Sequence, residues 1–101
     1  MVMRRAARVD ANQADIVHVL RRAGATVQLI HVIGDGCPDL LVGWRGRNLL
    51  LEVKDGSRPP SERCLTPDEE RWHALWRGQV AVVTCEREAL ALLDPLLRRQ
   101  P

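Results

Sequence analysis

Hydrophobic positions at helical spacing predict a first helix over residues 11–23. Its apolar stripe is formed by Ile16, Leu20 and Ala23. Asp10 or Asn12 could cap the start of this helix, and Gly24 follows it as a stop.

Short β-branched and aliphatic runs predict four strands, at residues 26–30, 38–43, 48–54 and 79–84. The loop before the second strand contains Gly34 and Gly36, which are typical turn residues. Residues 44–47 join the second and third strands as a four-residue connection of hairpin length. We expect the fourth strand to be buried.

A second helix is predicted to start at Thr66 and Pro67, with Thr66 as its cap and Glu69 closing a capping box. Three large apolar residues recur at helical spacing in it and are expected to be buried: Trp72, Leu75 and Trp76. A last helix is predicted from residue 86 to about residue 94, where Pro95 interrupts its continuation.

The predicted element order is αβββαβα, which favours the α/β (α+β) class with a mixed central sheet flanked by helices. No repeat, low-complexity tract or long linker divides the 101 residues. We therefore expect a single domain over residues 1–101, with its core at about residues 10–94. Apolar residues make up 46% of the chain, which is enough for one modest core.

Composition narrows the class of protein and its compartment. No apolar run approaches the roughly 18–20 residues that span a bilayer, and no apolar signal segment follows the arginines near the start. The cysteines have the spacing of neither a disulfide framework nor a zinc site: Cys37, Cys64 and Cys85. We expect a soluble, cytoplasmic protein with no membrane partner.

The net charge of +2 says little about partners, but the basic residues are unevenly distributed. Fourteen of the fifteen are arginine, and Lys54 is the one lysine. A group of them lies between residues 44 and 63: Arg45, Arg47, Lys54, Arg58 and Arg63. Such a group can pair with nucleic-acid phosphates, or it can be an ordinary solvated surface.

The predicted hairpin brings two acids together. With residues 44–47 as its loop, facing residues have numbers that add up to 91, so Asp39 lies opposite Glu52. Opposed residues share a face of the sheet, and Lys54 points to the same side as Glu52. The other face is apolar: Leu40, Val42, Leu49, Leu51 and Val53. A slip of one residue in the register would abolish this arrangement.

Two opposed carboxylates beside an aliphatic sheet repel each other and lose hydration, which destabilises the strand pairing. A divalent cation reverses this effect, because Mg²⁺ takes oxygen ligands such as the carboxylates of Asp39 and Glu52. The alternative is a surface charge cluster in which Lys54 partly neutralises the pair. We favour the metal site, since a purely structural hairpin gains nothing from facing acids.

Pro38-Asp39 followed by Glu52-Val53-Lys54 resembles the signature of the PD-(D/E)xK nucleases. Longer segments are similar to the small stand-alone VRR-NUC domain proteins of phages and bacteria: residues 36–43, 50–56, 59–61, 65–68 and 76–83. The resemblance covers about residues 10–93. It implies a restriction-endonuclease-like core that hydrolyses DNA phosphodiesters with Mg²⁺ or Mn²⁺.

By this resemblance Asp39 and Glu52 hold the metal, with the main-chain carbonyl of Val53 as a further ligand. Lys54 would orient or polarise the attacking water and offset charge in the transition state. The family usually supplies another acid from the first helix. Asp15 is the candidate here, and Gln13 could hydrogen-bond a water at the metal, although both could equally be ordinary polar residues at a helix start.

Candidates for contacts to DNA phosphates are Arg45, Arg47, Arg58 and Arg63, each of which could instead be a plain surface residue. Trp44, in the predicted turn, could stack on a base. The leading expectation is a metal-dependent DNA endonuclease acting on branched or junction DNA as a homodimer, because symmetric cutting of two strands by one small domain requires a two-fold pair. The alternatives are a non-catalytic DNA-binding or accessory module on the same scaffold and a pure protein-interaction domain.

Overall fold

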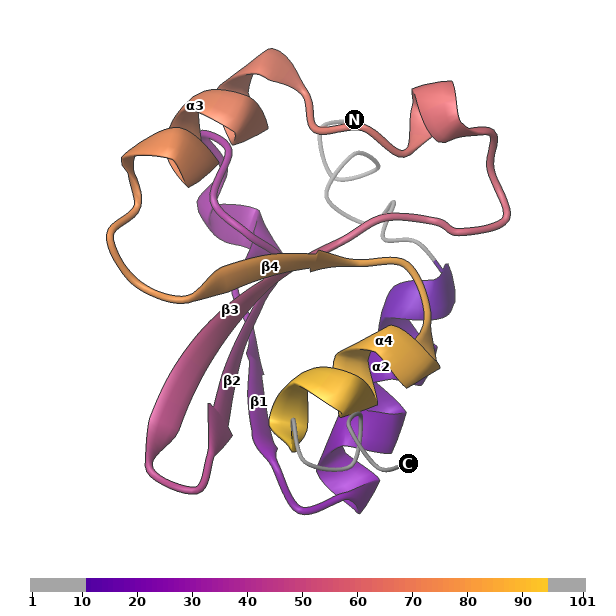
Figure 1. The fold of residues 1–101 in the computed structure, drawn as a ribbon, viewed down its shortest axis with the longest axis vertical. Helices are drawn as coiled ribbons and strands as arrows, with labels where there is room; N and C mark the ends of the chain where they lie inside the picture. Colours follow the sequence, from indigo (N-terminus) through magenta and orange to yellow (C-terminus); the bar gives the residue numbers. More distant parts are fainter. Residues whose placement is uncertain (1–10, 95–101) are drawn as a thin grey trace.

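The computed structural model describes residues 11–94, and Figure 1 shows their arrangement. The predicted cap Asp10 and the predicted helix breaker Pro95 lie outside this range. The helices are α2 (Ala11–Arg22), α3 (Pro67–Leu75) and α4 (Glu86–Leu93), with short 3-10 helices η1 (His31–Ile33) and η2 (Pro60–Glu62). The strands are β1 (Thr26–Leu29), β2 (Leu40–Trp44), β3 (Arg47–Val53) and β4 (Val80–Val83).

The strands form one sheet in the order β1-β2-β3-β4. The first two pairings are antiparallel, whereas β4 lies parallel to β3. A parallel neighbour requires a crossover, and the segment containing α3 supplies it (Figure 1). The prediction of a mixed sheet in an α+β chain is therefore confirmed.

The β2–β3 register is the predicted one, with Leu40 opposite Leu51. Pairing continues as far as Trp44 and Arg47, so the predicted four-residue connection is wrong and the turn has two residues. These two, Arg45 and Gly46, have positive φ angles of 48° and 79°. Positive φ at both positions matches the right-handed twist of the flanking strands, which favours such short turns in hairpins.

The hydrophobic core lies between one face of the sheet and the helices α2 and α4 (Figure 1). The face predicted to be apolar is buried here, through Leu40, Val42, Leu51 and Val53, with Leu49 partly buried. The helices contribute buried side chains that pack against it: Ile16, Val17, Leu20, Ala89 and Leu93. The opposite face of the hairpin is thereby free to carry polar groups.

Helix α3 has the predicted capping box at Thr66 and Glu69, but its apolar residues are not in the core. Leu75 is 71% exposed and Trp76 is 45% exposed, and no residue of the helix is buried. The prediction of burial is wrong because α3 lies beyond the ends of the strands, where no sheet face is beneath it (Figure 1). Trp76 stacks on Trp72 instead, with ring centroids 4.6 Å apart.

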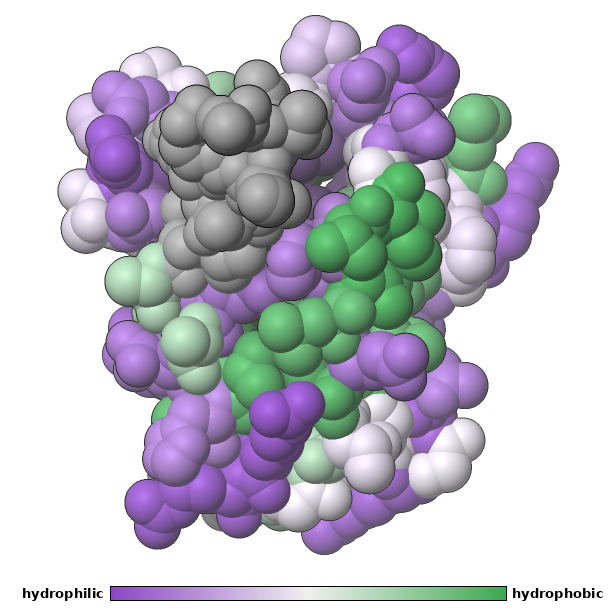
Figure 2. All heavy atoms as spheres, turned by 180° about the vertical axis from the view of Figure 1, so that it is seen from behind, coloured by the Kyte–Doolittle hydropathy of each residue, from purple (hydrophilic) through white to green (hydrophobic). Residues whose placement is uncertain are grey.

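Among residues 11–94, helices cover one face of the sheet, not both as predicted. Val82 in β4 is accordingly 42% exposed, so the fourth strand is not fully buried. Exposed apolar residues also lie at the end of the edge strand β1 (Leu29) and in η1, which follows it (Val32 and Ile33). Figure 2 shows a continuous apolar surface on the side of the molecule that is hidden in Figure 1. In the described part of the chain, no helix has the length and apolarity needed to cross a membrane.

Candidate functional site

Asp39 lies immediately before β2, where the regular ladder ends. Its N–H donates to the carbonyl of Leu51 (3.0 Å), and its own carbonyl accepts from the N–H of Ile30 (2.9 Å). The Asp39 carboxylate accepts a hydrogen bond from the N–H of Val53 (2.8 Å). The side chain thus replaces a main-chain acceptor at the end of β3, which fixes the carboxylate beside Glu52. Burial raises the pKa of Asp39, and the Val53 N–H partly opposes this effect.

Glu52 is the next carboxyl in the site and is only 3% exposed. Its Oε2 lies 3.7 Å from the Nζ of Lys54, whereas its Oε1 is buried and has no hydrogen-bond partner among the described residues. Burial, followed by the negative charges of Asp39 and Glu69, raises the pKa of Glu52 to about 9. Burial without a cation therefore favours the protonated form of this carboxyl.

Lys54 follows β3 and is held through both its main chain and its ammonium group. Its N–H donates to the carbonyl of Val83 (2.9 Å), and its Nζ donates to Oε1 of Glu69 (2.7 Å). Burial alone would lower the pKa of Lys54, but the hydrogen bond and charge of Glu69, with the two other carboxylates, raise it above its ordinary value. The ammonium therefore stays charged.

Glu69 joins the site from the first turn of α3. The sequence predicts this residue only as part of a capping box, and its Oε1 does accept from the N–H of Thr66 (2.9 Å). The same oxygen also accepts a hydrogen bond from the Lys54 ammonium. This contact is not predicted from the sequence, because the spacing between residues 54 and 69 does not indicate that they meet. Burial would raise the pKa of Glu69, but the hydrogen bonds from Lys54 and Thr66 lower it. We refer to Asp39, Glu52, Lys54 and Glu69 as the acid–lysine cluster.

The first helix reaches the acid–lysine cluster through Asn12. Its Nδ2 donates to the carbonyls of Lys54 (2.8 Å) and Thr84 (3.3 Å), so Asn12 joins α2 to the sheet and does not cap the helix as predicted. Gln13, the next residue, is 4% exposed, and its Nε2 has no hydrogen-bond partner within residues 11–94. Asp15 is exposed to solvent, and none of the hydrogen bonds or ion pairs found among residues 11–94 joins this candidate acid to the acid–lysine cluster.

The acid–lysine cluster combines three carboxyl groups with one ammonium group, and its most buried carboxyl oxygen is unpaired. An unpaired buried oxygen beside a second carboxylate suits a hard cation, which would also return the pKa of Glu52 toward its ordinary range. No set of three or more His, Cys, Asp or Glu side chains among the described residues is arranged to hold a metal. The fit therefore rests on Asp39 and Glu52, with the main chain at Val53 beside them.

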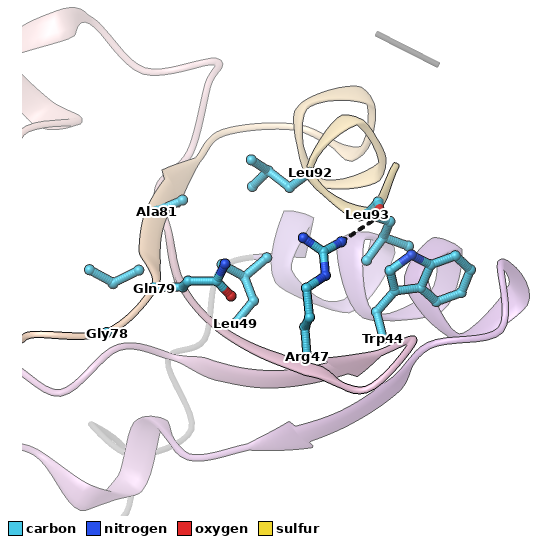
Figure 3. Close-up of a pocket in the computed structure, with 9 residues that line it drawn as sticks. Trp44, Arg47, Leu49, Gly78, Gln79, Ala81, Leu92 and Leu93 are labelled. Carbon is cyan, nitrogen blue, oxygen red and sulfur yellow. Dashed lines mark hydrogen bonds between the residues drawn. The ribbon is translucent and has the colours of Figure 1, made fainter. Parts of the chain in front are cut away.

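The hairpin tip carries three of the predicted DNA-contact residues, and each has a partner within the chain. Arg45 lies over the ring of Trp44 (4.9 Å) and forms an ion pair with Asp94 (3.8 Å). Arg47 donates to the carbonyl of Leu93 at the end of α4 (3.2 Å; Figure 3). Trp44 is partly buried and packs against the core.

Arg47 and Trp44 line one side of a pocket of about 360 Å³, with Leu49, Ala81 and Leu92 among the other lining residues (Figure 3). This pocket is at the far end of the hairpin from the acid–lysine cluster. Trp44 is the fifth residue after Asp39, and five residue steps correspond to about 17 Å at the usual rise of a strand. The predicted basic group is therefore divided between two ends of the sheet.

Arg58 and Arg63 lie in the segment that follows Lys54, at the same end of the sheet as the acids. Arg58 pairs with Asp55 (3.7 Å) and Glu62 (3.1 Å), and its side chain remains largely exposed. Arg63 donates through Nε to the carbonyl of Arg58 (2.8 Å). Of the four predicted arginines, only these two belong to the segment that directly follows Lys54. Neither family models, nor curated proteins, nor solved structures include a match to this chain.

Proposed function

We propose that this protein is a Mg²⁺- or Mn²⁺-dependent endonuclease that hydrolyses DNA phosphodiester bonds. The observation that carries the proposal is the buried Glu52 carboxyl, whose Oε1 is unpaired and which lies beside Asp39 and Lys54. A carboxyl group in this position destabilises the sheet unless a cation or a proton compensates its charge. The resemblance to VRR-NUC nucleases supports the same conclusion from the sequence.

Asp39 and Glu52 would hold the divalent cation, with the main-chain carbonyl of Val53 as a third oxygen. The bound ion would supply Lewis-acid stabilisation of the charge that develops on the phosphate. Glu52 would release its proton when the cation binds, because the cation then compensates the negative charge. Asp39 would stay oriented by the N–H of Val53 throughout.

Lys54 would place a fixed positive charge beside the phosphate and orient the attacking water. Its charge is maintained chiefly by the Glu69 carboxylate, which lies 2.7 Å from Nζ, although the side chain is largely buried. A charge fixed before the reaction stabilises the transition state without reorganisation. The compact ammonium suits this confined position better than a broad, planar guanidinium.

The proposal extends to the DNA and to the assembly. Arg58 and Arg63 would contact phosphates near the scissile bond, and branched or junction DNA is the proposed substrate. A homodimer would cut two strands symmetrically, which light scattering in solution would test. We place the protein in the cytoplasm, because Cys37, Cys64 and Cys85 are free thiols, as expected in a reducing compartment.

A non-catalytic DNA-binding module is the second candidate function. The finding that favours it is that the described residues offer no set of three metal-binding side chains. This alternative predicts DNA binding that weakens with salt and no cleavage with any divalent cation.

The test is cleavage of supercoiled, flap and four-way-junction DNA with Mg²⁺ or Mn²⁺. We expect cutting by the wild type and a loss of about 10²-fold or more in Asp39→Asn, which keeps an oxygen acceptor for Val53 but loses the charge. Asp15→Asn is the matched control, because it removes the charge of an exposed acid on α2. Equal cutting by Asp39→Asn and wild type would overturn the assigned site, and binding without cutting would favour the second candidate.

A further inference from the structure

We propose that Glu69 is a positioning residue that holds the ammonium of Lys54 beside the Asp39–Glu52 pair and away from the unpaired Glu52 oxygen. The inference rests on the proposed nuclease function. It adds a residue from a different element, α3, that is not one of the two proposed metal ligands and that accepts a hydrogen bond from the Lys54 ammonium.

The distances around Lys54 show which carboxylate determines the position of its ammonium. Nζ is 2.7 Å from Oε1 of Glu69, within hydrogen-bond range, but 3.7 Å from Oε2 of Glu52. A lysine side chain is long and has many rotamers, so a single strong acceptor decides where its charge lies. Without Glu69 the nearest acceptor for the ammonium would be Glu52 itself.

Glu69 can act as an anchor because its own carboxylate is fixed. Its Oε1 also accepts from the N–H of Thr66, while the Thr66 hydroxyl accepts from the N–H of Glu69 (3.2 Å). These reciprocal bonds form the capping box of α3. One carboxylate oxygen therefore joins the start of a helix to the ammonium of Lys54.

The start of α3 is in turn located against the loop that leads to Asp39. A side chain at Gly36 would collide with the main-chain carbonyl of Asp68, so the two backbones are in close contact. The loop that carries Asp39 and the helix that carries Glu69 thus have a fixed relation to each other. The position of Lys54 relative to the acid pair follows from this contact.

Conservative variants separate positioning from folding. Glu69→Gln keeps an oxygen that can accept from Thr66, since glutamine also closes capping boxes, but it removes the charge that holds Lys54. Glu70→Gln makes the same chemical change at the adjacent, exposed residue and is the matched control. Thr66→Ala weakens the cap but leaves Glu69 able to pair with Lys54, so it controls for damage to the helix.

The first readout uses the single lysine of the chain. Protein labelled with ¹⁵N-lysine has one side-chain ammonium signal, and a hydrogen bond protects it from exchange with water. We expect a protected signal in the wild type, Glu70→Gln and Thr66→Ala, and a shifted or lost signal in Glu69→Gln. An unchanged signal in Glu69→Gln would overturn the proposal, whether or not the protein cleaves DNA.

The second readout is the cleavage rate. For Glu69→Gln we expect a fall of about tenfold in kcat, with little change in KM for DNA, because the change misplaces Lys54 without altering the proposed DNA contacts. An unchanged kcat together with a displaced lysine signal would overturn the effect on catalysis. A wild type that never cleaves would overturn the proposed function, while the lysine signal would still decide the contact between Glu69 and Lys54.

Discussion

The two oxygens of Glu52 have different surroundings. One lies near the ammonium of Lys54, and the other is buried without a described donor. In that environment the neutral form is favoured, because burial and the neighbouring acids outweigh the charge of Lys54 unless a further cation binds. Ionisation of Glu52 is therefore the residue-level property through which pH, metal binding and stability are connected.

The stability of the metal-free protein should fall as pH rises from about 5 to 9. The pKa of Glu52 is raised from 4.5 to about 9, so the folded state binds more protons than the unfolded state in this range. The contribution of Glu52 to stability is complete below the pKa that it has in the unfolded chain. This contribution is lost as the pH rises toward the pKa that it has in the folded protein. The lowered pKa of Glu69 acts in a different range, because that contribution is lost only at acidic pH.

Urea unfolding in EDTA at several pH values tests this prediction. In the wild type, ionisation of Glu52 should lower the free energy of unfolding by at most about 1.4 kcal/mol per pH unit, and Glu52→Gln should remove this pH dependence. The variant should therefore be more stable than the wild type at alkaline pH. Parallel curves for the variant and the wild type would show that Glu52 ionises normally.

Replacing Lys54 by arginine should reduce cleavage although the charge is kept. The space beside Glu52 and Glu69 holds a compact ammonium, and a planar guanidinium would not reach the same position. We expect a loss of about 10²-fold in kcat for Lys54→Arg and almost none for the reverse change Arg22→Lys, which is the control at an exposed position of α2. Full activity of Lys54→Arg would contradict the proposed need for a point charge.

At the scale of elements, the hairpin was predictable and the setting of α3 was not. Alternation in residues 38–54 defines one apolar face, and the short connection fixes the register, so the approach of Asp39 to Glu52 follows from sequence. The capping box of α3 is likewise local and predictable. The contact between Glu69 and Lys54 depends on where α3 lies in space. The apolar residues of α3 predict a helix packed on the core, but none of them is buried in the structure, so the sequence pattern gives the wrong position for this helix.

Gly36 provides an element-level test of how α3 is placed. Gly36→Ala combines a positive φ of 83° with a collision against the Asp68 carbonyl. We expect a loss of about 2–4 kcal/mol in the free energy of unfolding and a displaced Lys54 ammonium signal. Gly34→Ala is the matched control, since Gly34 has a φ of 78° but open space around its Cβ position.

The control Gly34→Ala should lower the free energy of unfolding only by the backbone strain, about 1 kcal/mol, and should keep the Lys54 ammonium signal. Urea unfolding and the ¹⁵N-lysine spectrum measure both effects. Equal losses in the two variants would show that the contact between Gly36 and α3 does not position the site.

At the scale of the whole molecule, the sheet separates two groups of residues. The acid–lysine cluster lies at one end, and the arginines of the hairpin tip lie at the other, where Arg47 binds the end of α4. In the sequence, Asp39, Glu52 and Lys54 are interspersed with Arg45 and Arg47, and the direction of the strands separates the two groups in space. Because of this separation, basic residues that are clustered along the chain do not form one continuous basic surface around the acid–lysine cluster.

Two arginine variants should therefore behave differently. Arg47→Ala removes the hydrogen bond to the Leu93 carbonyl and should lower stability by about 1 kcal/mol without weakening DNA binding. Arg58→Ala should leave stability nearly unchanged but weaken DNA binding and reduce its salt dependence. Thermal unfolding and binding titrations at several salt concentrations measure the two effects, and the opposite pattern would move the DNA to the hairpin tip.

The central claim is that Asp39 and Glu52 together bind a divalent cation. A crystal soaked in Mn²⁺ and measured for anomalous scattering tests it most directly, because manganese is located independently of the protein atoms. The account predicts an anomalous peak between the two carboxylates, with Lys54 still bonded to Glu69, and no such peak in a Glu52→Gln crystal. A wild-type crystal with no peak there, or with the Lys54 ammonium between the two carboxylates, would contradict it.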